Sequence, residues 1–148
     1  MYKYKDEFIN DFIARTKVLL ERNSDTEYDV TLFINCLLGL LIIPKERNKK
    51  VIDDSLFSSD LIRRITECIS KDTYSDHNMS QIIRHVRNSF VHGNFEPKEK
   101  EESEPKVVGS LVIKDSYIKK GFIFEMECPI ELFKEFVIEC ANVFQTIV

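Results

Sequence analysis

The chain has 148 residues, a length that fits one domain and allows roughly two thirds of the unfolded surface to be buried. Its 21 basic and 25 acidic residues give a formal net charge of -4, which excludes a protein that coats nucleic acid through bulk positive charge. We therefore expect a single domain over residues 1–148, with any polyanion contact confined to a local basic site.

Two amphipathic helices are predicted in the first third of the chain. Residues 5–22 repeat apolar side chains at three- and four-residue spacing, and Asp25 or Thr26 is a suitable N-cap for a second helix that runs to Ile43. The second helix is apolar nearly all round in its C-terminal half, which predicts that it is the most buried one. Asn35 lies within it, and we expect its amide to bond a neighbouring helix or to support a functional site.

Two more helices are predicted after a polar loop. The basic residues at 45–50 in that loop form either a solvated surface or a phosphate-binding patch. A helix is predicted over residues 59–70, capped by Ser58 or by the serine that follows it. The next helix runs from Asn78 to a stop at Gly93, because glycine adopts positive φ angles freely.

The last third of the chain combines a β-hairpin with a final helix. Residues 96–106 are charged, contain two prolines and lack apolar side chains, so they predict a flexible connector. Residues 107–114 and 122–127 have the pattern of two short strands, and Pro129 fits the first turn of a helix that runs to residue 147. The expected fold class is mainly α, a helical bundle of about five helices with a β-hairpin inserted before the last helix.

Cysteine and hydropathy patterns indicate the compartment. The four cysteines have no C-x-x-C spacing and lie in apolar patterns, so we expect buried free thiols rather than zinc ligands or disulfides. The N-terminus lacks the apolar core of a signal peptide, and the longest apolar run, residues 32–43, is shorter than the roughly 18 residues of a membrane span. These patterns predict a cytoplasmic protein with no membrane segment, no metal and no cofactor.

The predicted helix from Asn78 to Gly93 has two chemically different faces. One face is an apolar stripe that we assign to the core, and it consists of Met79, Ile82, Ile83, Val86 and Phe90. The opposite side collects cationic and hydrogen-bonding groups, namely Arg84, Arg87, Asn88 and His92. His85 is expected to be an ordinary surface histidine, and His77, in the preceding loop, has no partner that can be named.

Arg87, Asn88 and His92 form the candidate catalytic set. Arginine is a natural clamp for phosphate because its planar fork of donors is permanently charged. Histidine titrates near neutral pH and can take or give a proton without a metal. Cleavage of RNA by its own 2′-hydroxyl needs a base at that hydroxyl and positive charge at the developing phosphorane, and these residue types meet both needs.

At these residues the sequence resembles the HEPN superfamily, whose ribonucleases share an Arg-polar-x-x-x-His motif in a helical bundle. The apolar second helix, the His-Gly-Asn-Phe at 92–95 and the late hairpin are also similar to small stand-alone bacterial HEPN nucleases. The resemblance implies a metal-independent endoribonuclease that forms a homodimer, with the motifs of both subunits facing one cleft for RNA. It also implies a role as a toxin or phage-defence effector, with an antitoxin as a further partner.

The resemblance also assigns a role to each residue of the set. Arg87 would hold the scissile phosphate, Asn88 would orient groups at the site, and His92 would act as the acid or base. Arg84, one turn before Asn88, is either a second phosphate contact or part of a surface or dimer salt bridge. Some HEPN toxins carry a modified tyrosine two residues after the motif histidine, and here that position is Asn94, so regulation by that modification is not expected.

The spacing of the motif raises a geometric problem. Arg87 and His92 lie about 140° apart around a straight helix, so they cannot simply point together. We therefore expect either that the helix ends at His92, which lets this residue turn toward Arg87, or that a homodimer combines groups from both subunits in a composite site. Two alternatives to a nuclease stay open: a dimeric module that binds nucleic acid or nucleotide without cutting it, and a protein-interaction bundle.

Overall fold

The computed structural model describes residues 11, 13–18, 39, 52–74, 78–99 and 108–147. The chain divides into two compact units, one made of residues 1–50 and 137–148 and the other of residues 51–136. The helix with the candidate catalytic set belongs to the second unit. A single domain over residues 1–148 stays a prediction.

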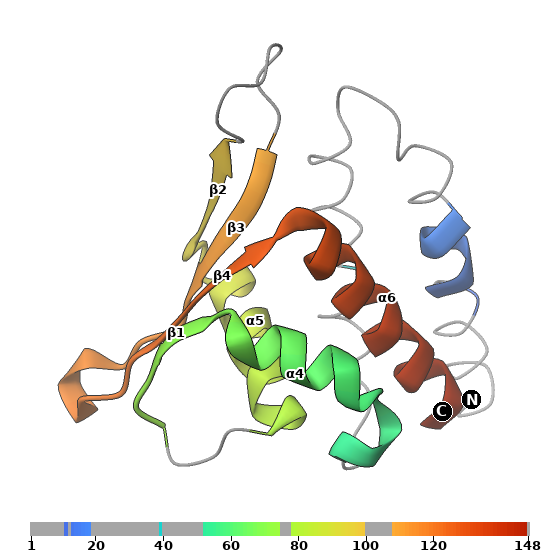
Figure 1. Cartoon of the computed structure of the whole chain (residues 1–148), viewed down its shortest axis with the longest axis horizontal. Coiled ribbons are helices and arrows are strands. Elements are labelled where there is room, and N and C mark those ends of the chain that lie inside the picture. Colours follow the sequence, from blue (N-terminus) through green and yellow to red (C-terminus); the bar gives the residue numbers. More distant parts are fainter. Residues whose placement is uncertain are drawn as a thin grey trace, which may run out of the picture. The chain divides into compact units, whose positions relative to one another are not determined.

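A four-stranded antiparallel sheet is the main element of the second unit (Figure 1). The strands are β1 (Ile69–Asp72), β2 (Phe95–Glu99), β3 (Val108–Lys114) and β4 (Phe124–Pro129), in the spatial order β1-β4-β3-β2. Ile113 of β3 lies opposite Met126 of β4 and Phe95 of β2, which sets the register across the centre of the sheet. Because side chains alternate along a strand, the neighbouring residues of Ile113 point to the other face.

The sheet overturns the predicted fold class: a mainly α bundle with one inserted hairpin is wrong, and the fold mixes helices with a four-stranded sheet. The hairpin of β3 and β4 was predicted and is confirmed, but it forms the middle of the sheet. β2 covers residues 95–99, at the start of the segment predicted as a flexible connector. β1 covers residues 69–72, which were predicted as a helix end and a loop.

The two edge strands, β1 and β2, were not predicted because their amino-acid composition is not typical of strands. Pro97 and the charged residues of β2 are tolerated because an edge strand leaves one side of its backbone in water. The side chains of residues 96–99 are exposed, so backbone pairing with β3 rather than apolar burial holds this strand. β1 has only four residues, and Ser70 and Lys71 in its middle are exposed, so no alternation of apolar and polar residues marks it.

The described helices are η2 (Asp54–Leu56), α4 (Ser59–Glu67), α5 (Met79–Val91), η3 (Ile118–Lys120) and α6 (Ile130–Ile147), where η denotes a 3₁₀ helix. The predicted N-cap Ser58 is confirmed, since its Oγ accepts from the Leu61 N–H at 3.1 Å. The helix predicted to begin near Asn78 starts at Met79, and Asn78 is its N-cap, with Oδ1 accepting from the Gln81 N–H at 2.9 Å. α4 ends before residue 70 because the chain enters β1. Pro129 is the last residue of β4, and α6 begins directly after it.

Several predictions fall wholly or partly outside the described residues. The predicted helix over 5–22 is helical at residue 11 and over 13–18, and the second predicted helix is described only at Gly39. Also outside the described residues lie Asn35, Cys36, the basic residues at 45–50 and His77.

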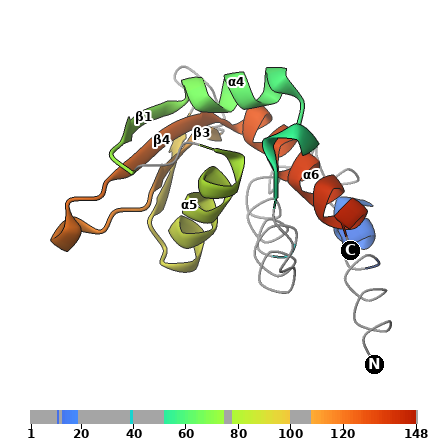
Figure 2. The same ribbon diagram turned by 90° about the horizontal axis from the view of Figure 1, so that it is seen from below.

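α5 packs its apolar stripe against one face of the sheet (Figure 2). All five residues that were assigned to the core are buried, with Phe90 the most exposed at 6%. The buried residues of the sheet are Leu111, Ile113, Phe124, Met126 and Cys128. Phe90 also stacks on Phe95, with ring centroids 4.4 Å apart. This packing fixes the rotation of α5 and therefore decides which of its polar side chains are accessible.

The described cysteines are free thiols, and the prediction of buried thiols is confirmed for Cys128 and Cys140, whereas Cys68 is half-buried. Burial raises the pKa of the Cys128 and Cys140 thiols. Since the thiolate is the reactive form, both residues act as small apolar groups of the core.

In the first unit, Ile13 and Thr16 are buried on the described N-terminal helix segment. Lys17 Nζ donates a hydrogen bond to Asn142 Oδ1 of α6 at 2.6 Å. Within the described ranges, no helix combines the length and the apolar content that crossing a membrane requires.

Candidate functional site

The candidate site begins where α5 ends. Val91 is the last helical residue and His92 is the C-cap, with its N–H donating to the Asn88 carbonyl at 3.0 Å. Gly93 follows with a φ of 70°, a left-handed conformation that glycine adopts without a steric penalty. The turn is closed by Ser89, whose Oγ donates to the Asn94 carbonyl at 2.7 Å. The predicted stop at Gly93 is confirmed.

The four predicted site residues differ in exposure and in their contacts. Arg84 and His92 are exposed, and Arg87 and Asn88 are half-buried. Arg87 Nη2 donates to Asn88 Oδ1 at 2.9 Å, so the structure brings these two residues together. Between the described residues, no hydrogen bond or ion pair joins the His92 imidazole to Arg87 or Asn88. Ending the helix at His92 therefore does not by itself connect the two ends of the motif.

His85 was predicted on the surface, and that prediction is wrong. Its side chain is 1% exposed, and Nδ1 lies 2.7 Å from Asp115 Oδ2. The imidazole stacks on the Phe124 ring and lies against the Tyr74 ring, with centroids 4.3 Å away in both cases. The sheet covers this part of α5, and Asp115 supplies the hydrogen-bond partner that makes burial of a polar ring tolerable.

Asp115, directly after β3, was not predicted as part of the site. Its carboxylate, 17% exposed, accepts hydrogen bonds at the same oxygen from His85 and from Asn88 Nδ2, the latter at 3.2 Å. Tyr74 Oη donates to the Asp115 main-chain carbonyl at 3.3 Å. Asp115 therefore ties the end of β3 to the polar side of α5.

Tyr74 was also missed, and its surroundings help to place Arg84. Burial raises the pKa of the Tyr74 hydroxyl, the Asp115 charge raises it further, and the Arg84 charge lowers it. The positive charge of Arg84 thus acts on the same neighbourhood as the Asp115 carboxylate. Arg84 nevertheless keeps an exposed side chain, which leaves it accessible to an anion from solution.

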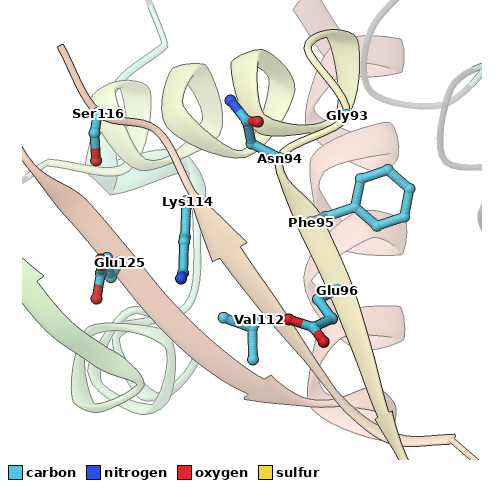
Figure 3. Close-up of a pocket in the computed structure, with 8 residues that line it drawn as sticks. All are labelled: Gly93, Asn94, Phe95, Glu96, Val112, Lys114, Ser116 and Glu125. Carbon is cyan, nitrogen blue, oxygen red and sulfur yellow. The ribbon is translucent and has the colours of Figure 1, made fainter. Parts of the chain in front are cut away.

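A pocket of about 480 Å³ opens next to the end of the motif (Figure 3). Its wall begins at Gly93 and Asn94, directly after His92, and continues over the outer face of the sheet. The other residues that line it are Phe95, Glu96, Val112, Lys114, Ser116 and Glu125. This pocket offers an ammonium, an amide, a hydroxyl and two carboxylates to a ligand.

Lys114 differs from Lys98, another lysine on the outer face of the sheet, in that it forms no described ion pair. It lies opposite Glu125 between β3 and β4, and Figure 3 shows its side chain extending between Glu125 and Val112. On the same face, Lys98 Nζ forms an ion pair with Glu127 Oε1 at 2.7 Å. No ion pair within 4.0 Å joins Lys114 to another described residue, so its charge is available in the pocket.

The described residues contain no group of three His, Cys, Asp or Glu side chains that could hold a metal ion. The residues at the end of α5 combine guanidinium, amide and imidazole groups, and groups of these kinds can donate hydrogen bonds to phosphate oxygens.

Fold and site together define a class of protein, an α/β domain with an Arg-Asn-x-x-x-His motif at the C-terminal end of a helix that lies on an antiparallel sheet. The family model described as HEPN pEK499 p136 matches residues 1–148, and the chain belongs to this family. The HEPN assignment made from the sequence is thereby confirmed. Comparison with curated proteins and with solved structures gave no match.

Proposed function

We propose that this HEPN protein is a metal-independent endoribonuclease that cleaves RNA through attack of the 2′-hydroxyl on the neighbouring phosphate. The observation that supports it best is how the arginine and the histidine of the motif are held. Arg87 is held by the Asn88 amide, and His92 is exposed at the helix end with no described side-chain bond that would occupy its imidazole. A fixed phosphate clamp and a free proton carrier are the two groups that this reaction needs.

In the proposed reaction Arg87 binds the scissile phosphate and stabilises the charge that builds up on it. His92, exposed at the end of α5, acts as the general acid that protonates the leaving 5′-oxygen. Arg84 contacts a second phosphate of the same strand, since its exposed side chain lies one turn before Asn88.

The proposal includes a homodimer with a composite site. Within one chain His92 does not contact Arg87 among the described contacts, and a two-fold axis near the end of α5 brings His92 of one subunit to Arg87 of the other. Val91, which precedes His92, has 56% of its surface exposed, as expected for an apolar side chain that a second subunit covers. The proposed setting is the cytoplasm, where the enzyme acts as a toxin or phage-defence effector restrained by an antitoxin.

The pocket beside His92 extends the proposed substrate path. Lys114→Ala is expected to raise the KM for RNA about fivefold and to leave kcat near the wild-type value, because one phosphate contact away from the reacting bond is lost. Lys98→Ala is the matched control: this lysine lies on the same face but is already paired with Glu127, so its removal leaves KM unchanged. If the two substitutions changed the KM for RNA equally, the RNA would not run through this pocket.

Two oligonucleotides that differ in a single atom test the proposed chemistry. The protein should cut a single-stranded RNA, and the same RNA with one 2′-deoxy nucleotide on the 5′ side of the mapped cleavage position should stay intact there. Cleavage at the deoxy position would exclude 2′-hydroxyl attack. Binding of the RNA by titration without any cleavage would assign the chain to the non-catalytic binding modules instead.

A further inference from the structure

The orientation of the Asn88 amide is determined by its two neighbours. A carboxylate can only accept hydrogen bonds and a guanidinium can only donate them. The Nδ2 side of Asn88 must therefore face Asp115, at 3.2 Å, and the Oδ1 side must face Arg87, at 2.9 Å. The amide is a directional link from the end of β3 to the arginine of the motif.

Asp115 is itself held by a second donor, His85, which bonds the same carboxylate oxygen as Asn88. His85 Nδ1 must carry a proton to donate to the Asp115 carboxylate at 2.7 Å, and the imidazole is fixed between the rings of Tyr74 and Phe124. Because His85 is 1% exposed, its ring has no room to turn away. The buried pair thus gives Asp115 a fixed position from which to orient Asn88.

We propose that Asp115 is a positioning residue for RNA cleavage: through Asn88 it sets the direction in which the Arg87 guanidinium points. Asp115 is not placed in contact with substrate, and its action passes entirely through the amide. The inference rests on the proposed ribonuclease function. It gives a role to the link of three hydrogen bonds that runs from a buried histidine to a half-buried arginine.

Removing the Asp115 carboxylate leaves the Asn88 amide without the acceptor that fixes its orientation. In Asp115→Ala the Asn88 amide loses its acceptor and can rotate, so the oxygen that accepts from Arg87 Nη2 is no longer held in one direction. A misplacement of about 1 Å at a catalytic group lowers rates by about 100-fold, so we expect kcat to fall by roughly that factor with KM changed less than about threefold. Asp115→Asn keeps an acceptor at the same place and should retain activity within about tenfold of wild type.

An exchange of the two partners separates positioning from a merely structural role. Asn88→Asp places a carboxylate against Asp115 and should lower kcat about 100-fold. Adding Asp115→Asn restores the pair in reverse, because the new amide donates to the new carboxylate, which still accepts from Arg87. The same amide group also donates to His85 Nδ1, which accepts once the imidazole proton moves to Nε2, an atom with no other described partner. The double variant should regain activity to within about tenfold of wild type, whereas a loss of folding stability at Asp115 would not be repaired by this change.

Tyr74→Phe is the matched control, since it removes a hydrogen bond to the Asp115 main-chain carbonyl and leaves the carboxylate untouched. It should retain wild-type kcat. Failure of the exchange variant to recover activity while Asn88→Asp and wild type are both folded would overturn the positioning role, as would wild-type activity in Asp115→Ala. A wild-type protein that does not cleave RNA would refute the proposed function itself and the positioning role with it.

Discussion

Arg87→Ala and His92→Ala are each expected to reduce the rate of RNA cleavage by about 1,000-fold. Loss of a general acid costs about 100- to 10,000-fold, and loss of one donor that stabilises transition-state charge costs about 100- to 1,000-fold. The measurement is single-turnover cleavage of a labelled single-stranded RNA, which separates the chemical step from product release.

The exposure of each side chain determines whether its removal could lower the activity simply by destabilising the fold. His92 is exposed and forms no described side-chain bond, so His92→Ala should leave the unfolding temperature unchanged. Arg87 is half-buried, so Arg87→Ala could also lower stability. Arg87→Lys is therefore the better variant at this position, because it keeps the charge but lacks the planar fork that bonds Asn88 and would bind phosphate. Lys119→Ala, on an exposed residue of η3, should behave as wild type. Retained cleavage in both motif variants would reject the assigned site.

Mixing the two inactive variants is expected to restore activity. If Arg87 of one subunit works with His92 of the other, a heterodimer of Arg87→Ala and His92→Ala has one site with both residues intact and one site with neither. After random exchange of subunits about half of the dimers are mixed, so the mixture should recover about a quarter of the wild-type activity.

The recovery distinguishes a composite site from a site within one subunit. A site built within one chain gives no recovery, because every chain in the mixture lacks one of the two residues. Each variant alone, carried through the same exchange procedure, is the control for activity that comes from refolding or contamination. No recovery in a mixture that is shown to contain heterodimers would contradict the composite site and leave the nuclease proposal to depend on His92 turning toward Arg87 within its own subunit.

Local sequence signals predicted the helix of the motif well. The apolar stripe of α5, its start near Asn78 and its stop at Gly93 are all confirmed, because each depends on residues within one or two helical turns. The β3–β4 hairpin was predicted for the same reason: alternation of apolar residues and a turn near Gly121 lie within a short stretch.

What the sequence did not predict depends on distant partners. β2 was hidden because its charged residues gain their order from pairing with β3 rather than from their own composition. Asp115 lies 27 residues beyond Asn88, and nothing in the sequence of α5 indicates that the end of β3 returns to it. Helical position did offer one usable signal, since His85 lies about 60° around the helix from Asn88, near enough to share a partner.

Product analysis of the wild-type protein tests the central claim most directly. Single-stranded RNA is incubated with the purified protein in excess EDTA, and the new ends are identified by mass spectrometry. The proposed reaction predicts cleavage that leaves 2′,3′-cyclic phosphate on one fragment and a 5′-hydroxyl on the other, since the 2′-oxygen attacks and the 5′-oxygen leaves. Fragments with 3′-hydroxyl ends, or RNA that stays intact at protein concentrations that saturate binding, would contradict it.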